Sequence, residues 1–248
     1  MADWKDTSRD AQRVGSVPRA GGDVAGRVSY DEGLRKHMLS IYNYMSSGVL
    51  LTGIVALLAF TSGVAETIFT GGILRWIVAL SPLAIVFAMS FGANRFSTGA
   101  LQLMFWAFAT VMGLSLSSVF LIYTGGSIAT TFFATSAAFA GLSLFGYTTK
   151  KDLSGFGSFL IMGVIGLIVA MIINLFLQSP AFHYAISFIG VLIFAGLTAY
   201  DTQSLKNEYS YVRGTEFAGK AVILGALELY LDFINMFRFL LTFLGERE

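Results

Sequence analysis

Cysteine is absent from this sequence of 248 residues, which also has only two histidines and three prolines. Without cysteine the chain has no disulfide, no thiolate metal site and no cysteine nucleophile. The two histidines, His37 and His183, are not spaced as a metal-binding pair. Charged residues make up 12% of the chain and its net charge is +1. No basic stripe stands out, so nucleic-acid binding is not indicated.

Apolar residues are abundant instead. They make up 55% of the chain, and the mean hydropathy is +0.71. This composition predicts an all-α, polytopic membrane protein whose surface mostly contacts the lipid bilayer. Seven apolar stretches have about the 17 to 25 residues that a membrane-spanning helix needs. They lie near residues 38–60, 72–92, 100–123, 126–147, 156–178, 181–201 and 219–244.

Residues 1–37 differ from the rest in composition. They contain seven basic and six acidic residues and no apolar run of the kind found in a secretory signal. We therefore predict a polar, disordered cytoplasmic leader over 1–37 and a single transmembrane domain over 38–248.

Small residues at Ala137 and Gly141 have the spacing of a close helix contact.

Basic residues set the expected orientation, because short loops rich in Lys and Arg stay in the cytoplasm. If the leader is cytoplasmic, the cytoplasmic segments hold the seven basic residues of the leader and six more. These six are Arg95, Lys150, Lys151, Lys206, Arg213 and Lys220. The opposite side holds Arg75 and Arg247, and Arg238 lies in the last apolar stretch. We predict a cytoplasmic N-terminus and, after seven spans, an external C-terminus.

The last apolar stretch contains "LELYLDFINMFRFLL", with two carboxylates in an otherwise apolar run. Asp232 lies roughly 20 Å of helical rise into this helix. Glu228, Asp232 and Asn235 have i, i+4 and i+7 spacing, which puts them on one face, while Tyr230 points away from it. Such a face is expected to point into the bundle, since an intramembrane charge costs roughly 2.5 to 3.5 kcal/mol.

Two interpretations of these polar residues stay open at this point. In the first, they form a structural seam, with Asp232 paired to Arg238 or Arg95. In the second, they mark an ion or proton pathway. Asp201 closes the sixth stretch in "AGLTAYDTQSLK", where it could simply contact water at the membrane surface.

Several membrane enzymes and receptors can be excluded. A retinal protein needs a lysine inside the membrane, and every lysine here lies in the leader, in a loop or, for Lys220, at the very start of the last apolar stretch. An intramembrane serine protease needs a basic partner for its serine, and no histidine lies in the middle of a predicted helix. Asp201 and Asp232 could form an aspartyl protease dyad, but Asp201 follows Ala-Tyr rather than a GxGD motif. An enzyme is therefore only a minor alternative.

Two segments carry a resemblance to a known family. "LTAYDTQSLK" and "LYLDFINMFRFLL" resemble the paired signatures of the Bax inhibitor-1 family, also called the transmembrane Bax inhibitor motif family. The stretches that begin at Ser97 and Lys150 are similar to the family as well, and the likeness spans roughly residues 30–245. It implies six helices around a central seventh, without a bound cofactor.

The resemblance also implies a function. In bacterial members a hydrogen-bonded pair of aspartates is viewed as a pH sensor that gates a calcium leak, and an arginine acts as a latch. The resemblance implies that Asp201 and Asp232 form this pair and that Arg95 is the latch. Glu228 departs from the neutral polar residue that members often carry there, and the segment between Asp201 and the last helix is longer than in compact members. Some bacterial members are similar to modulators or substrates of a membrane-anchored quality-control protease, engaged through the N-terminal tail.

The chemistry of two adjacent carboxyl groups agrees with this expectation. They cannot both ionise cheaply in a region of low dielectric constant, so they would share a proton and pin their helices together. Loss of the last proton would leave repelling charges and oxygen ligands for Ca²⁺ at Asp201 and Asp232, with Glu228 and Asn235 as auxiliary ligands. The favoured function is a pH-sensitive calcium leak channel of a bacterial inner membrane, with Ca²⁺ and H⁺ as its ligands. The alternative is an interaction protein that modulates a membrane protease.

Overall fold

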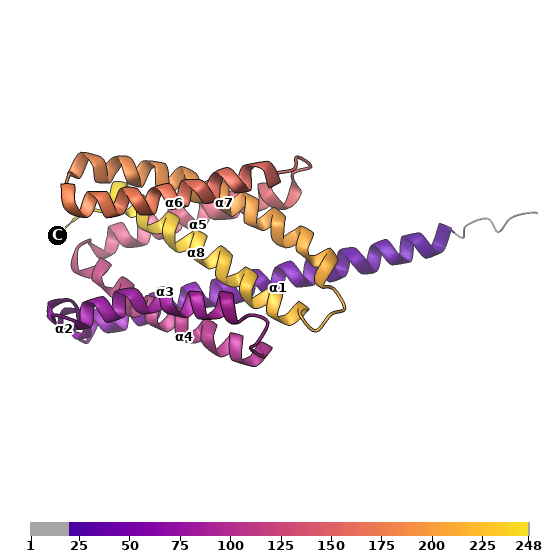
Figure 1. Ribbon diagram of the computed structural model, residues 1–248, viewed down its shortest axis with the longest axis horizontal. Coiled ribbons are helices and arrows are strands. Elements are labelled where there is room, and N and C mark those ends of the chain that lie inside the picture. The colour runs from indigo at the N-terminus through magenta and orange to yellow at the C-terminus, as the bar shows by residue number, and fades with distance from the viewer. Residues whose placement is uncertain (1–19, 248) are drawn as a thin grey trace, which may run out of the picture.

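The computed structural model describes residues 20–247 and the side chains from Tyr30 onward (Figure 1). The proposed tail contact with a protease falls largely on residues 1–19, which lie outside the described residues. The described chain is helical, with one isolated β-bridge between Tyr123 and Arg247. The all-α prediction is confirmed.

Each of the seven predicted stretches corresponds to a long helix, and one short helix precedes the second stretch. The helices are α1 (Ala20–Thr61), α2 (Val64–Thr70), α3 (Leu74–Gly92), α4 (Thr98–Leu116), the 3₁₀ helix η2 (Ser117–Leu121), α5 (Gly125–Thr148), α6 (Ser154–Leu177), α7 (Pro180–Val212) and α8 (Ala218–Leu244).

Six of these helices have the length and apolar composition needed to cross a membrane. They are α1 from Tyr30 onward, α3, α4 together with η2, α5, α6 and α7. The remaining long helix, α8, has 27 residues but contains Lys220, Glu228, Asp232 and Arg238. The chain is thus a multi-pass membrane protein, and most of α8, which carries these four charges, is shielded by the other helices.

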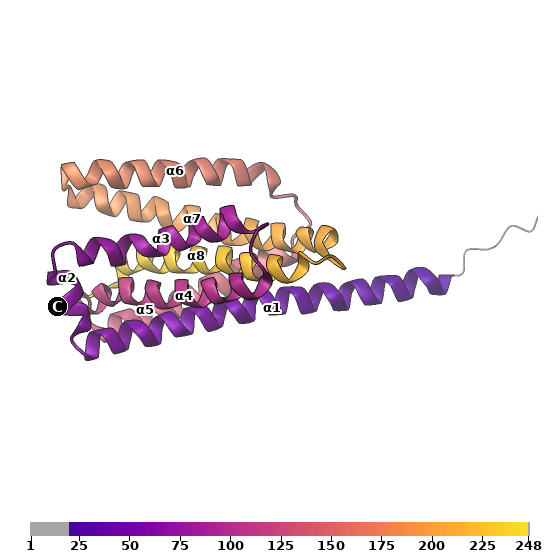
Figure 2. The same cartoon turned by 60° about the horizontal axis from the view of Figure 1, so that its bottom comes forward.

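Helix α8 occupies the centre of the bundle. It packs on α7, α1, α5 and α4. In Figures 1 and 2 it runs between α6 and α7 on one side and α1 and α4 on the other. Most of its residues between Ala221 and Leu241 are buried. The predicted central position of the seventh long segment is therefore confirmed.

The N-terminal boundary lies earlier than predicted. Helix α1 begins at Ala20, so residues 20–37 of the expected disordered leader are helical. Leu34 and His37 are buried. The rings of Tyr30 and His37 contact Tyr209 of α7, with centroid separations of 5.4 and 5.2 Å. Packing on α7 explains why residues 30–37 are helical.

Helix α7 continues past its predicted end, so Asp201 lies within the helix and does not close it. Gln203 accepts a hydrogen bond from the Leu153 amide (2.8 Å) and donates one to the Lys151 carbonyl (2.9 Å). Lys206 donates to the Tyr147 carbonyl over 2.7 Å. These contacts hold the extension against the end of α5 and the α5–α6 loop.

The close contact expected from Ala137 and Gly141 is made elsewhere on α5. Both residues are exposed, and the space where a side chain would stand on Gly141 is open. Gly146 is buried instead, and a Cβ there would collide with the Ala199 carbonyl of α7. The prediction from small-residue spacing was wrong because spacing alone does not tell which face meets a neighbouring helix.

Candidate functional site

The candidate site lies between α7 and α8, which share the most extensive helix contact in the described chain. The carboxyl groups of Asp201 on α7 and Asp232 on α8 lie within reach of each other. Asp201 is half-buried, and Asp232 is only 3% exposed. Ionised carboxyls can only accept hydrogen bonds, so a hydrogen bond between these two groups requires a proton on one of them.

Asp232 has no basic partner among the residues whose side chains the structure describes. Among the described residues, its buried Oδ2 atom accepts no hydrogen bond from an N–H or a hydroxyl group. The groups that act on it electrostatically are Asp201 and Glu228, both acidic. The structural seam in which Asp232 pairs with Arg238 or Arg95 is therefore not formed in this structure.

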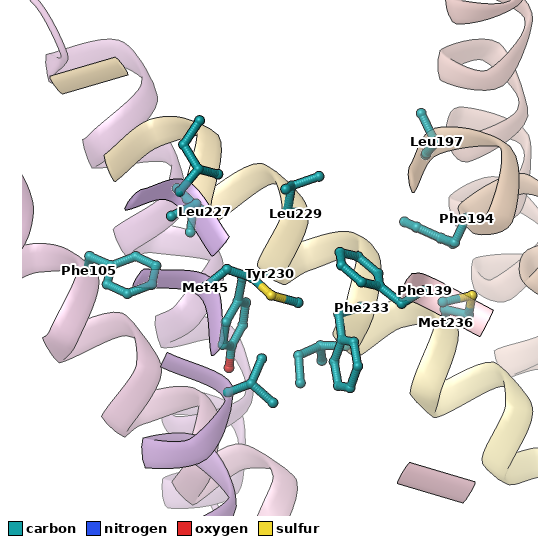
Figure 3. Close-up of a cluster of buried hydrophobic side chains, with 14 of the residues drawn as sticks. Met45, Phe105, Phe139, Phe194, Leu197, Leu227, Leu229, Tyr230, Phe233 and Met236 are labelled. Atoms are coloured by element: carbon teal, nitrogen blue, oxygen red, sulfur yellow. The ribbon is translucent and has the colours of Figure 1, made fainter. Parts of the chain in front are cut away.

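Apolar side chains surround α8 at the level of Asp232. Figure 3 shows Phe194 and Leu197 of α7 on one side of α8 and Phe105 and Met45 on the other. All four are buried. An apolar environment excludes water and strengthens both the shared hydrogen bond and any repulsion between two ionised carboxylates.

The other predicted members of the polar face are not gathered around the pair. Glu228 is exposed, so the face does not point wholly into the bundle. Its carboxylate nevertheless lies within electrostatic range of Asp201 and Glu208. Asn235 is half-buried and donates to the Leu231 carbonyl of its own helix (2.9 Å). The local spacing on α8 was right, but burial changes along that face.

Arg95 also lies apart from the pair. It is exposed in the turn between α3 and α4, where its amide donates to the Gly92 carbonyl (2.8 Å). Within the described chain, its guanidinium is not among the groups that act on Asp201 or Asp232. Lys220 of α8 bonds this turn instead, through the Ala93 carbonyl (3.1 Å). The position of Arg95 in a turn beyond α3 explains why it does not reach the pair.

The predicted calcium ligands do not form a complete metal site. Among the described side chains, Tyr30 to Arg247, there is no group of three or more histidine, aspartate or glutamate residues placed to hold a metal. Ca²⁺ takes six to eight oxygen ligands, and the aspartate pair offers only two carboxyl groups. In this conformation the pair is suited to holding a proton rather than a cation.

A hydroxyl chain beside the site was not anticipated. Thr52 of α1 donates to the Ala109 carbonyl of α4 over 2.8 Å, and its Oγ1 lies 2.6 Å from the Tyr230 hydroxyl of α8. Because the single Thr52 proton is used on Ala109, Tyr230 is the donor to Thr52. Tyr230 points away from the acidic face as predicted, but its role in joining three helices has no local signal in the sequence.

A second contact missed by the sequence lies next to Asp201. The Thr202 hydroxyl contacts the Ser143 hydroxyl of α5 at 3.4 Å and donates to the Thr198 carbonyl at 2.7 Å. Together with Gln203, Thr202 fixes the rotation of α7 about its axis at the level of Asp201. The sequence signal for this contact is limited to a cluster of polar residues after Asp201, "TQS".

Comparison with known proteins gives consistent matches over nearly the whole chain. A family model described as "Inhibitor of apoptosis-promoting Bax1" matches residues 34–248. An uncharacterized protein of Caulobacter vibrioides is 48% identical over 229 residues, which cover 88% of this chain and 91% of the relative. Inner membrane protein YbhL of Escherichia coli K12 is 45% identical over 218 residues, covering 87% and 93%. The uncharacterized membrane protein SpyM3_0260 of Streptococcus pyogenes is 35% identical over 221 residues, covering 88% and 96%.

Proposed function

The chain belongs to the Bax inhibitor-1 family of membrane proteins, and we propose that it provides a pH-sensitive leak pathway for cations, with calcium as the conducted ion. The observation that carries this proposal is the close approach of the Asp201 and Asp232 carboxyl groups between two packed helices. The pair has no basic neutralising group among the described residues. A shared proton is therefore the simplest means of keeping it closed.

The proposed gate works through the charge of this pair. With one proton on the pair, the hydrogen bond joins α7 to α8 and closes the pathway. When that proton leaves, two carboxylates repel each other across an apolar contact, where screening by water is weak. Separation of the helices would then admit water and expose oxygen ligands to a cation. Flux should thus rise as pH increases.

Acidic residues on the approach to the pair favour a cation over an anion. Glu228 and Glu208 lie within electrostatic range of one another, and Glu228 is also within range of Asp201. Glu228 is exposed and Glu208 is half-buried. Negative charges that line an approach raise the local concentration of cations. We place this approach on the cytoplasmic side.

The proposed location is the bacterial inner membrane, as the name of the Escherichia coli relative suggests. The proposed orientation has the N-terminus in the cytoplasm, because Lys150, Lys151, Lys206 and Lys220 gather at one end of the bundle. The C-terminus would then be external. No catalytic role or resident cofactor is proposed.

Calcium flux into liposomes that contain the purified protein tests this proposal. Flux is measured between pH 5 and pH 8 for the wild type and for Asp201→Asn and Asp232→Asn. We expect wild-type flux to increase with pH, because the shared proton is lost. Each amide variant should flatten that dependence, since Asn keeps the size of the side chain and cannot ionise.

Asp152→Asn is the matched control. Asp152 is an exposed carboxyl in the α5–α6 loop, where its Oδ1 accepts the Ser154 amide over 2.9 Å. Hydrogen bonds from Ser154 hold the pKa of Asp152 below its usual value, so it stays ionised throughout the assay. Asn keeps the acceptor, and the control should conduct like the wild type. Absence of wild-type flux above empty liposomes at every pH would refute the leak.

A further inference from the structure

A second polar site lies on α8 toward its C-terminal end, apart from the carboxyl pair. A cavity of about 350 Å³ is bordered by α3, α4, α6, α7 and α8. Its lining is mostly apolar, and its polar side chains are Ser115, Asn235 and Arg238. We call this cavity the α3–α6 groove. An arginine in such a setting needs a counter-charge, because a charge in an apolar region is costly.

The protein does not supply that counter-charge within its described residues. Among the described side chains, Tyr30 to Arg247, no carboxylate pairs with the Arg238 guanidinium, and Arg238 is exposed on the surface of the bundle. Asn235 is the neighbouring polar residue in the groove, and its amide already donates to Leu231. The described residues therefore leave Arg238 available to an anion from the surroundings.

The groove is open to lipid. Helix α3 packs on α4, and α6 packs on α7. The groove lies between the α3–α4 pair and the α6–α7 pair. Leu83 of α3 and Ile168 of α6 line it and are 51% and 48% exposed. Both are apolar and belong to membrane-spanning helices, so the exposed parts face acyl chains. A ligand would enter sideways from the bilayer.

The depth of Arg238 suits a lipid headgroup. It lies about 9 Å along the helix axis from Leu244, the last residue of α8. At this end of the bundle Arg75 stacks over Trp76 at 5.4 Å, and Tyr184 is 46% exposed beside Phe243. Tryptophan and tyrosine at such positions mark the membrane interface. The Arg238 side chain can reach from the groove toward this level.

We propose that the α3–α6 groove binds an acidic phospholipid, whose phosphate pairs with Arg238 while an acyl chain lies along the apolar lining. The charge and the shape of the groove both favour this ligand. Arginine binds phosphate oxygens through its planar array of donors. The apolar walls accommodate a hydrocarbon chain, which a soluble anion lacks. This inference does not depend on the proposed cation leak.

The test measures retained phosphatidylglycerol by native mass spectrometry. The full-length protein is reconstituted in phosphatidylcholine bilayers with a small fraction of phosphatidylglycerol and then extracted in mild detergent. The wild type should retain phosphatidylglycerol in preference to phosphatidylcholine. Arg238→Gln should weaken that preference about 5- to 10-fold, as expected for the loss of one charged phosphate contact. Arg238→Lys should weaken the preference for phosphatidylglycerol less than Arg238→Gln does.

Two further variants separate the groove from general surface charge. Arg75→Gln removes a cation at the same end of the bundle, outside the groove, and should change retention less than 2-fold. Ala79→Phe fills part of the groove lining while leaving Arg238 in place, and it should also lower retention. Circular dichroism and thermal unfolding establish that each variant is folded.

Three outcomes would overturn the proposal. Equal retention by Arg238→Gln and the wild type would show that Arg238 does not bind the lipid. Equal losses in Arg238→Gln and Arg75→Gln would indicate unspecific attraction to the membrane surface. Displacement of phosphatidylglycerol by millimolar inorganic phosphate would identify a site for a soluble anion instead.

Discussion

Thr52 shows how one side chain can connect several helices in a membrane protein. Its hydroxyl donates to Ala109 of α4 and accepts from Tyr230 of α8, and all of this lies in the bundle interior. Phe105 and Phe108 pack edge-on against the Tyr230 ring, with centroid separations of 6.3 and 5.0 Å. The three-helix junction therefore combines a hydrogen-bond chain with close aromatic packing two residues from Asp232.

Removing the Thr52 hydroxyl should destabilise the protein. Thr52→Val keeps the shape but leaves the buried Tyr230 hydroxyl without its acceptor, so we expect a loss of about 1–3 kcal/mol in the free energy of unfolding. Unfolding in mixed detergent micelles, followed by circular dichroism, measures this loss. Thr130→Val is the control, since Thr130 is exposed and bonds only to Gly126 of its own helix. A control loss as large as that of Thr52→Val would contradict this role.

At the scale of the helix, α5 and α7 are held together by close backbone approach and by polar contacts. Gly146 meets the Ala199 carbonyl, and the Ser143 and Thr202 hydroxyls meet one turn away. These contacts lie beside Asp201 and fix the side of α7 that faces α8. The geometry of the carboxyl pair thus depends on a helix that contributes no carboxylate to it.

Alanine at two glycines of α5 should have opposite effects. At Gly146 a Cβ collides with backbone, so Gly146→Ala should lower stability by about 1–3 kcal/mol. At Gly141 the space is open, so Gly141→Ala should raise stability by about 0.5–1 kcal/mol through helix propensity. The same unfolding measurement compares the two variants. Equal effects would mean that α5 and α7 are not in close contact at Gly146.

At the scale of the whole molecule, charge is distributed unequally between the two ends of the bundle. One end carries Lys150, Lys151, Lys206, Arg213 and Lys220, and the other carries Arg75 and Arg247. The basic end is also where α1 and α7 extend beyond the bundle, with Arg213 of the α7 terminus over the Tyr30 ring of α1 at 5.0 Å. This asymmetry favours a single orientation in the membrane.

Single cysteines can test that orientation, because the natural chain has none. Ser210 and Ser62 are exposed at opposite ends of the bundle. With a membrane-impermeant maleimide on intact bacterial cells, Ser62→Cys should be labelled, and Ser210→Cys only after the membrane is disrupted. The reverse pattern would invert the orientation, and with it the side from which Glu228 and Glu208 are reached.

Hydropathy along the chain was enough to predict an all-α membrane protein, seven long helices and their approximate positions, because the length of an apolar run is a local property. The signatures around Asp201 and Asp232 likewise indicated the family. The end of α7 was predicted too early at Asp201, because the Gln203 and Lys206 contacts that extend the helix are made with distant residues.

Tertiary structure alone decided which polar residues meet. Helical spacing placed Glu228 and Asp232 on one face, but only packing leaves the first exposed and buries the second against Asp201. It also separates Arg95 from the pair and places Arg238 in a groove open to lipid. The physical reason is that the rotation of a helix about its axis, and its register against its neighbours, depend on contacts between residues far apart in sequence.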